Sequence, residues 1–462
     1  MLNQNIQAVE DNLLTAVSIH GIPKKSYNLL DRMKYFHVPG VSIAVINNAN
    51  IEWARGYGVL ETNRNTQVSP ETLFQAASIS KPVSAMLVLR LVEQGKLDLN
   101  IDVNKYLSSW QIPENEHTEK NKVTLRGILS HTAGLTVHGF QGYGSDSEVP
   151  SLLQILNGET PANSAPIQVG VAPGSMFRYS GGGYTVMQQI LEDISGKTFE
   201  ELLQTEILDK LHMHSSTFEQ PLPMQLREKA ATGHIGAGIP IKGKWHTYPE
   251  KAAAGLWTTP TDLAEFAIEI MKSYNNRSSK MLSASMADTM LTAVQDDYGL
   301  GLAVKKLGNN IIRFGHSGGN EGFRCYLTAY TGNEKGAVVM TNSDNGDHLM
   351  MEIVRSISSV YEWSDFPSIE KQVAPVNPNI YSQYAGKYQH PDYPDFVVQV
   401  ERDGSHLFFE AITGAPSWEG YPESETRYFF VESEASVEFE KNNAGIFDAL
   451  ILFSMRLEKV HN

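Results

Sequence analysis

The sequence predicts an α+β protein, in which one antiparallel sheet with flanking helices carries an inserted helical lobe and is followed by a small all-β barrel domain. Runs rich in β-branched and aromatic residues occur near the start of the chain and again after residue 310, with mostly helical patterns between them. Since early and late strands bracket a helical middle, we expect one sheet built from both parts. The predicted strands are 41–46, 51–57, 311–316, 323–330 and 337–341.

The helices are predicted from apolar periodicity and from their ends. An interrupted apolar stripe predicts helix over about 5–36. The run 83–92 is apolar on nearly every side, which is typical of a buried helix, and Gly95 is placed to end it. Thr259 and Pro260 suit the N-cap and first position of another helix. Further helices are expected over 123–131, 185–194 and 348–363.

The domain boundaries follow from a change in pattern. Residues 1–363 form the expected first domain, and 364–380 form a linker because this segment holds three prolines and no clear period. Residues 381–462 show short β runs between turns, as in a small sandwich or barrel. These runs are 396–400, 407–409, 428–431, 437–439 and 449–453.

Composition excludes several classes of partner. The formal net charge is −15 and the chain has no run of lysines or arginines, which argues against nucleic acid or an anionic membrane surface. No apolar run is long enough to span a bilayer, and the first residues do not form a signal peptide. Cys325 is the single cysteine, so an intrachain disulfide is impossible and the redox compartment stays open. The oligomeric state is not predicted.

Ser78 and Lys81 form the first candidate for chemistry. They are three residues apart at the tip of the buried helix, so on a helix their side chains share one face. A serine hydroxyl becomes a good nucleophile when a base such as lysine takes its proton, and a helix N-terminus suits a developing oxyanion. The pattern therefore indicates acyl transfer.

Two alternatives compete with this pair. Ser368 and Lys371 repeat the same spacing in the expected linker, which shows that the spacing alone is weak evidence. Cys325 with His316 could suggest a cysteine hydrolase, but Cys325 lies in the middle of a predicted strand among apolar residues, where thiols are usually inert.

Two further segments carry candidate site residues. Tyr179 precedes Ser180 and three glycines, where the backbone could approach a ligand and the phenol could relay protons; the alternative is a tight turn with a packed tyrosine. His316 begins a Gly-rich segment at the end of a predicted strand. The edge of that strand could align a substrate and lend a backbone N–H to an oxyanion. Taken singly, a histidine such as His316 is more often structural than catalytic.

Together these segments resemble the three active-site elements of serine β-lactamases and penicillin-binding proteins. The similar branch comprises class C β-lactamases, D-aminopeptidases, DD-peptidases and related esterases, and the likeness extends over about residues 25–362. The tail from Tyr384 resembles the lipocalin-like domains appended to some of these hydrolases. The matching elements are Ser78 to Lys81, Tyr179-Ser180-Gly181 and His316-Ser317-Gly318, supported by 128–135, 173–174, 254–256, 259–260 and 298–301.

The resemblance implies roles for these residues. Ser78 would be the nucleophile, Lys81 the base that activates it, and Tyr179 the group that carries protons to the leaving group. Backbone N–H groups of Ser78 and Gly319 would form the oxyanion hole. No metal or cofactor is implied. The expected substrate-binding residues are Gly181, His316, Ser317 and Gly318.

Two departures shape the expected activity. Gly181 stands where the family usually has asparagine, and His316 stands where it usually has lysine. Both changes weaken the case for efficient β-lactam hydrolysis and favour esters or D-amino-acid amides and peptides as small-molecule or short-peptide substrates. An unperturbed histidine would be mostly neutral at pH 7.5 and gain charge toward pH 6.

Other functions and the location stay open. The chain could be a class C-like β-lactamase, a DD-carboxypeptidase, or a protein that binds cell-wall peptide without catalysis. The resemblance implies a periplasmic or extracellular location, with any signal peptide absent from this sequence; the sequence itself leaves the location unknown.

Overall fold

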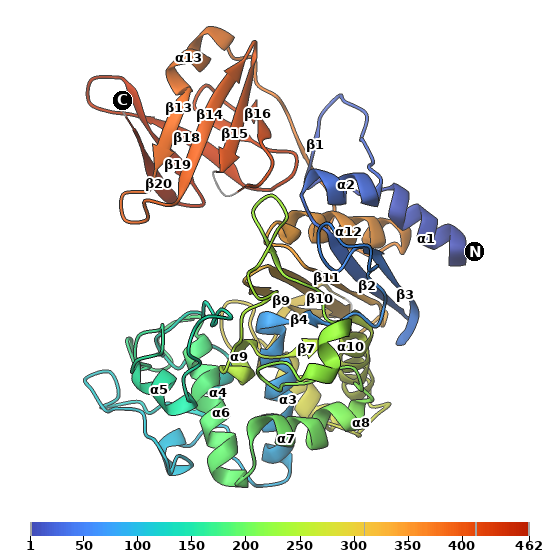
Figure 1. The fold of residues 1–462 in the computed structure, drawn as a ribbon, viewed down its shortest axis with the longest axis vertical. Coiled ribbons are helices and arrows are strands. Elements are labelled where there is room, and N and C mark those ends of the chain that lie inside the picture. Colours follow the sequence, from blue (N-terminus) through green and yellow to red (C-terminus); the bar gives the residue numbers. More distant parts are fainter. Residues whose placement is uncertain (1, 309, 412–413, 461–462) are drawn as a thin grey trace. The chain divides into compact units, whose positions relative to one another are not determined.

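The computed structural model describes residues 2–308, 310–411 and 414–460 and divides into two compact units (Figure 1). The sheet unit comprises Pro39–His234 and Pro240–Asp344. The barrel unit comprises the residues up to Val38, the segment Ile235–Ile239, and the chain from Asn345 onward. No helix among the described residues combines the length and apolar character needed to cross a membrane.

The sheet unit contains a six-stranded antiparallel sheet in the order β3-β2-β11-β10-β9-β8. Strand β2 pairs with β11, so the early hairpin and the late meander share one sheet, as predicted. The hairpin turns at Asn48 and Ala49, both with positive φ, which matches the twist of a two-residue hairpin loop. The short edge strand β8 was not predicted. The strands are β2 (Gly40–Asn47), β3 (Asn50–Gly58), β8 (Ala303–Lys306), β9 (Ile312–Asn320), β10 (Phe323–Tyr330) and β11 (Gly336–Thr341).

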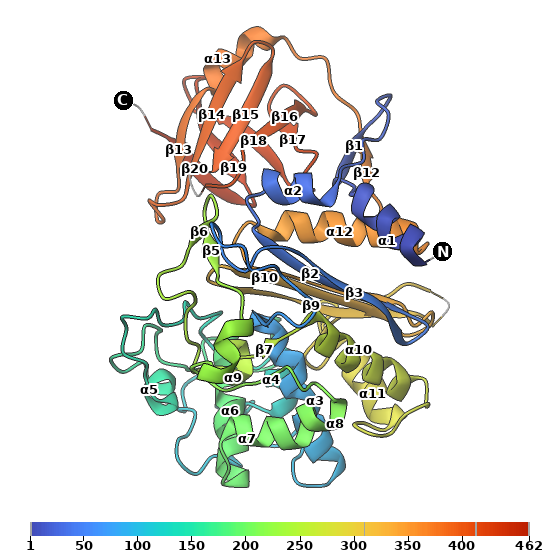
Figure 2. The ribbon, with the colours of Figure 1, turned by 45° about the vertical axis from the view of Figure 1, so that its right-hand side comes forward.

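The helices of this unit cover the sheet and form the lobe. Helix α10 (Pro260–Tyr274) contacts β2, β3 and β11, and lies along the sheet in Figure 2. Its start is as predicted, since the Thr259 side chain accepts from the N–H of Asp262. Helix α3 (Ser80–Glu93) is buried on nearly every side. The others are α4 (Leu125–Leu129), α5 (Leu152–Asn157), α6 (Gly181–Ser195), α7 (Phe199–Leu203), α8 (Asp209–Leu211), α9 (Lys251–Ala254) and α11 (Ala284–Leu291).

The part of the chain that the structure describes also contains four strands of two residues each. Strand β4 (Phe74–Gln75) pairs with β7 (Trp257–Thr258) just before Ser78, so that a short ribbon fixes the entry to α3. Strands β5 (His234–Ile235) and β6 (Ile239–Pro240) lie where the chain passes between the units.

The barrel unit contains a closed barrel of eight strands, which confirms the expected all-β barrel. Alternate strand residues are buried, as Val437 and Phe439 on either side of the exposed Glu438 show. Phe439 packs with Tyr384 and Tyr428 in an aromatic core. The strands are β13 (Gly386–Gln389), β14 (Val397–Asp403), β15 (His406–Ala411), β16 (Trp418–Pro422), β17 (Arg427–Phe429), β18 (Ser436–Lys441), β19 (Phe447–Leu452) and β20 (Met455–Lys459).

The prediction of one helix over 5–36 was wrong. This segment forms α1 (Leu2–Asp11), β1 (Val17–Ile19) and α2 (Leu29–Tyr35). The residues Val17 to Ile19 pair in parallel with β12 (Ile369–Lys371), and Gly21, two residues further on, has positive φ, which no helix accepts. Part of the expected linker thus forms a strand. The unit also holds α12 (Gly346–Val360), close to its predicted range, and α13 (Tyr381–Tyr384).

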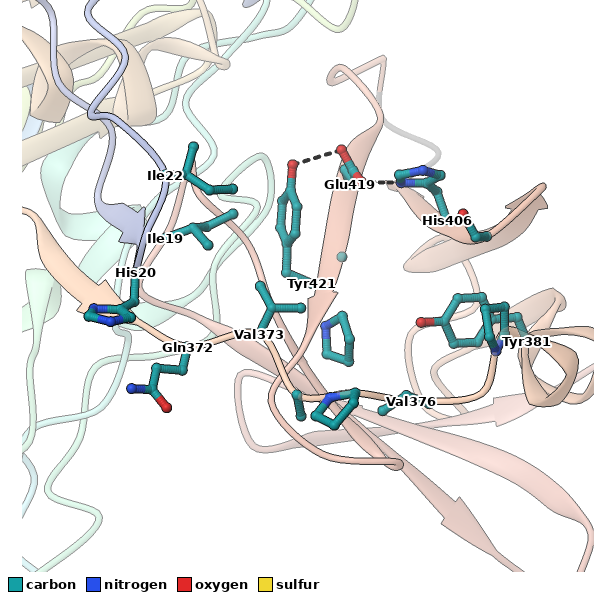
Figure 3. A pocket seen from close by; sticks show the side chains of 16 residues that line it. Ile19, His20, Ile22, Gln372, Val373, Val376, Tyr381, His406, Glu419 and Tyr421 are labelled. Atoms are coloured by element: carbon teal, nitrogen blue, oxygen red, sulfur yellow. Dashed lines mark hydrogen bonds and ion pairs between the residues drawn. The ribbon is translucent and has the colours of Figure 1, made fainter.

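A groove of about 680 Å³ lies in the barrel unit (Figure 3). Its polar wall is a hydrogen-bonded chain, in which Tyr421 Oη donates to Glu419 at 2.7 Å and His406 Nδ1 contacts the same carboxylate. Ile19, Ile22 and Val373 supply an apolar wall. The groove holds none of the predicted site residues.

Candidate active site

Ser78 lies in a strained turn. It is the middle residue of the short 3-10 helix η1 (Ala77–Ile79), which leads directly into α3. Ala77 has φ +48°, a left-handed conformation that costs a residue other than glycine about 1–2 kcal/mol. Neighbouring Ala76 is held on both sides: its N–H donates to Leu256 O at 2.8 Å, and its carbonyl accepts from Cys325 Sγ at 2.9 Å. These contacts hold the turn that presents the half-buried Ser78 side chain.

Lys81 lies one turn further along, with 2% of its surface exposed. Its Nζ is 2.9 Å from Ser78 Oγ and donates to Ala253 O, also at 2.9 Å. Helix α9 supplies this carbonyl, and Ser80 fixes the connection to α9 because its hydroxyl accepts from the Leu256 N–H. The structure therefore brings the predicted serine and lysine together and orients the lysine by a backbone carbonyl that the sequence did not indicate.

Tyr179 lies on the other side of Lys81, whose Nζ is 5.0 Å from the centre of the tyrosine ring. The next residue, Ser180, is the N-cap of α6, and its hydroxyl accepts from the Gly183 N–H at 2.9 Å. The cap fixes the backbone that positions the phenol. The predicted third member of the site therefore approaches the serine–lysine pair from the segment just before a different helix, α6.

His131 supports the tyrosine ring and was missed as a site residue. The two ring centres are 4.1 Å apart, and His131 Nδ1 accepts from the Ser180 N–H at 3.1 Å. Burial and the charge of Lys81 hold the pKa of His131 well below its usual value, so the ring is neutral with its proton on Nε2. The stretch 128–135 was noted only as a supporting match; nothing in it marked a histidine stacked on Tyr179.

His316 is neutral and fully hydrogen-bonded. Its Nε2 accepts from Tyr298 Oη at 2.9 Å, and its Nδ1 lies 2.5 Å from the Ser317 carbonyl. Burial, with a smaller effect of the nearby Lys81, lowers the pKa of His316 to about 3. The expectation that His316 gains charge toward pH 6 is therefore wrong, because a histidine deprived of water resists protonation. Tyr298, noted only within a supporting stretch, is the partner that occupies Nε2.

Strand β9 runs on through the glycines to Asn320, beyond its predicted end at His316. A Cβ on Gly318 would lie 2.3 Å from Ala76 O and 2.5 Å from Cys325 Sγ, so glycine allows β9 to approach the turn that holds Ser78. Ser317 and Gly319 alternate with Gly318 and face the other way, with both exposed in the cavity described below. The strand thus brings the Gly319 backbone to the wall that also holds Ser78.

Gly181 is covered by an aromatic side chain. A Cβ built on it would lie 3.0 Å from Phe140 Cε2 and 3.2 Å from His138 O, and its own N–H donates to that carbonyl at 2.9 Å. The space beside Gly181 is therefore occupied by the loop that carries His138 and Phe140. Neither residue was predicted, and only the departure from asparagine at 181 pointed to a change here.

These residues surround one cavity of about 430 Å³ in the sheet unit. Gly181 and Gly318 lie behind its walls; the other predicted site residues line it. Within the described ranges, no three His, Cys, Asp or Glu side chains gather in a way that would hold a metal ion. The lining residues are Ser78, Lys81, His138, Gly139, Phe140, Tyr179, Ala253, Ala254, His316, Ser317, Gly319 and Asn320.

The two competing nucleophiles have other partners. Cys325 is fully buried on β10 opposite Gly318 of β9, and its Sγ donates to Ala76 O, so it makes a structural contact. Ser368 Oγ donates to Thr15 O at 2.7 Å, whereas Lys371 pairs with Glu423 at 3.3 Å. Neither arrangement joins a nucleophile to a base.

The sheet unit thus brings a serine hydroxyl and a lysine amine within hydrogen-bond distance at the start of a buried helix. The sequence profile of the beta-lactamase family matches residues 29–359, and the chain belongs to that family. A profile for a domain of unknown function, DUF3471, matches residues 370–461. The family and fold expected from the sequence are confirmed.

Two curated relatives come from Staphylococcus aureus. Teichoic acid D-alanine hydrolase is 24% identical over 352 residues, which cover 75% of this chain and 81% of the relative. Protein flp (strain MRSA252) is 25% identical over 225 residues, 49% of this chain and 42% of the relative. The match to Protein flp thus spans less than half of that protein.

Two solved structures share the fold. The octameric penicillin-binding protein homologue from Pyrococcus abyssi has a TM-score of 0.65 and 21% identity, covering 93% of this chain and 98% of its own. D-amino acid amidase from Ochrobactrum anthropi SV3 has a TM-score of 0.60 and 19% identity, and the match covers 78% of this chain and 97% of the amidase chain.

Proposed function

We propose that this chain is a serine hydrolase that forms a covalent acyl-enzyme on Ser78 and acts on esters or on D-amino-acid amides and peptides. The observation that carries the proposal is the 2.9 Å separation of Lys81 Nζ and Ser78 Oγ at the wall of a cavity that Tyr179 also lines. A nucleophile within hydrogen-bond reach of a base, which a third group orients, is the arrangement that nucleophilic catalysis requires. Here Ala253 O orients the base.

The acylation step follows from these positions. Lys81, as the free amine, accepts the Ser78 hydroxyl proton while Oγ bonds to the substrate carbonyl carbon. The N–H groups of Ser78 and Gly319 donate to the oxyanion of the tetrahedral intermediate. Tyr179 donates its proton to the leaving oxygen or nitrogen as the bond to the carbonyl carbon breaks, and Lys81 returns a proton to the phenolate. The product is an ester of Ser78 plus the free alcohol or amine.

Deacylation reverses these roles. Tyr179, with Lys81, accepts a proton from water as the water oxygen attacks the acyl carbon, and the released Ser78 oxygen recovers a proton. The Ser317 backbone of β9 would align the substrate along the strand edge. The neutral, fully bonded His316 would support Ser317 through its own Nδ1 contact and offer no charge to a substrate carboxylate.

The names of two similar proteins support hydrolysis of D-amino-acid derivatives. One bears the name teichoic acid D-alanine hydrolase, and one structural neighbour is a D-amino acid amidase. In this chain Phe140 occupies the space that an asparagine at 181 would need, and His316 lacks the charge of a lysine. We therefore expect β-lactams such as nitrocefin to acylate Ser78 slowly.

The test is covalent labelling with a matched control. The full chain is treated with a fluorophosphonate probe and assayed with p-nitrophenyl butyrate, beside Ser78→Ala and Ser368→Ala variants. We expect Ser78→Ala to lose both labelling and turnover to background, and Ser368→Ala to keep both within about twofold. Peptide mapping that places the label on Ser368 or Cys325 would contradict the proposal.

A further inference from the structure

The cavity around Ser78 carries few charges. Its lining residues, given above, include no aspartate, glutamate or arginine. Lys81 is its one lysine, and both contacts of its Nζ are made inside the protein, to Ser78 Oγ and Ala253 O. The lining therefore offers a substrate neither a carboxylate to pair with an ammonium group nor a spare cation to pair with a carboxylate.

The two histidines of the lining are neutral. His316 makes hydrogen bonds with both ring nitrogens, and its pKa is lowered to about 3. Burial and the charge of Lys81 also lower the pKa of His138. The His138 ring lies 4.9 Å from the Tyr179 ring centre, and no hydrogen bond of its ring is found among the described residues. His138 thus adds an uncharged polar group to the cavity.

Arg324, a cation outside the lining, is already neutralised. Arg324 lies opposite Gly319 on β10, and its Nη1 is 2.8 Å from the Asp344 carboxylate and donates to the carbonyl oxygens of Asn320 and Phe323. Elsewhere in the lining, Phe140 packs over Gly181 and contributes an apolar surface. A charged group bound in this cavity would give up water without an opposite charge in return, which is costly.

We infer that the cavity selects substrates whose acyl group is uncharged and packs beside Phe140 and His138, and that it discriminates against both free ammonium and free carboxylate on the acyl chain. This inference rests on the proposed function, because it concerns the acyl group that Ser78 receives. It names a narrower class within that proposal: esters of uncharged acyl groups, in preference to D-amino-acid derivatives with a free amine.

Three p-nitrophenyl esters of matched shape test the inference. The butyrate, the β-alaninate and the hemisuccinate carry a methyl, an ammonium and a carboxylate group at the end of the same two-carbon spacer. For each ester, kcat/KM is divided by the rate constant of uncatalysed hydrolysis, and the rate of Ser78 acylation is followed by intact mass. We expect butyrate to exceed each charged ester by at least about tenfold in both measurements.

A charge placed in the wall should reverse part of this preference. Phe140→Asp adds a carboxylate beside the acyl group, and Phe140→Asn is the uncharged control of the same size. We expect Phe140→Asp alone to raise the ratio of β-alaninate to butyrate at least about fivefold, because a nearby opposite charge favours the ammonium. Phe140→Asn should leave that ratio within about twofold of the parent's. Taking the ratio within each variant cancels any loss of folded protein.

The outcomes distinguish failure of this inference from failure of the proposed function. Equal rates for the three esters, or a faster charged ester, with acylation mapped to Ser78, would overturn the inference and leave the proposed function in place. An unchanged ratio in Phe140→Asp would overturn the placement of the acyl group beside Phe140. Absence of any acyl adduct on Ser78 would overturn the proposed function, and the inference with it.

Discussion

Ser78–Lys81 and Ser368–Lys371 share one sequence spacing and differ in every physical respect that matters for catalysis. The first pair lies at a helix start, where residues three apart share a face, and its two polar atoms are 2.9 Å apart. The second pair spans β12, where successive side chains point to opposite faces, and each member bonds to a different partner. Spacing therefore specifies chemistry only once the secondary structure is known.

The surroundings separate the pairs further. Lys81 is buried and oriented by Ala253 O, beside a cavity with Tyr179. Lys371 is partly exposed and lies over the Phe429 ring, 5.2 Å from its centre. A base that keeps one geometry can act on a neighbouring hydroxyl, whereas an ion pair near the surface adds a little stability and no chemistry.

The largest effect is expected when the first pair loses the amine of its lysine. Lys81→Met keeps the length of the side chain and removes the amine, and we expect acylation of Ser78 by p-nitrophenyl butyrate to slow on the order of 10³-fold. Lys371→Met makes the same chemical change in the second pair and should leave acylation within about twofold. Pre-steady-state release of p-nitrophenol measures both. An acylation rate in Lys81→Met above about a tenth of the parent's would exclude Lys81 as the base.

The next largest effect concerns helix α9, whose Ala253 carbonyl accepts a hydrogen bond from Lys81 of the first pair. Glu250 lies immediately before α9, it is fully buried, and neither carboxylate oxygen has a hydrogen-bond partner among the described residues. Burial raises the pKa of Glu250 to about 8. Between its unfolded value of 4.5 and about 8, the folded state holds the proton that the unfolded state has released, so stability falls as pH rises across this window.

We therefore expect Glu250→Gln to abolish this pH dependence. The amide is neutral at every pH, so the variant should gain on the parent progressively from pH 5 to pH 8, by a few kcal/mol at most. The midpoint of thermal loss of Ser78 labelling, measured at each pH, reports on the sheet unit. Glu71 is exposed, so Glu71→Gln is the matched control. The difference between the midpoints of Glu71→Gln and the parent should stay constant with pH. A difference between Glu250→Gln and parent that is flat with pH would contradict the burial argument.

The sequence predicted those parts of the site that local patterns determine. The buried helix after Ser78, the cap at Thr259 and the β hairpin each depend on residues close in sequence, and all three are found. The single helix over 5–36 failed because β1 pairs with a strand some 350 residues later, and no local pattern announces such a partner.

The sequence did not predict the other residues of the candidate site for the same reason. Phe140 lines the cavity, whereas Tyr298 and His131 contact the lining residues His316 and Tyr179 from behind. These residues come from separate segments, and their contacts exist only in the folded chain. Burial also decided the charge of His316, which its type alone could not reveal. Residue identity indicated the reaction; the electrostatics of the cavity required the tertiary structure.

The smallest expected effect lies in the second pair and measures what its lysine does instead. Lys371 Nζ is 3.3 Å from Glu423, and both side chains are partly exposed, so water and salt screen their attraction. Surface ion pairs of this kind contribute about 0.2–1 kcal/mol, and a cation over an aromatic ring at an exposed site adds about 0.5–1 kcal/mol. Glu423 also pairs with Arg427 at 3.2 Å, so single variants would mix two interactions.

A double-mutant cycle of Lys371→Met and Glu423→Gln isolates the pair. Hydrogen exchange of peptides from β16 and β17, followed in the full chain at increasing urea, gives the free energy of opening of the barrel unit. We expect a coupling of about 0.2–1 kcal/mol that shrinks at 1 M salt, with esterase activity unchanged in all three variants. A coupling above about 2 kcal/mol would show a desolvated pair. Loss of activity would show that the second Ser-x-x-Lys sequence is tied to the chemistry of the first.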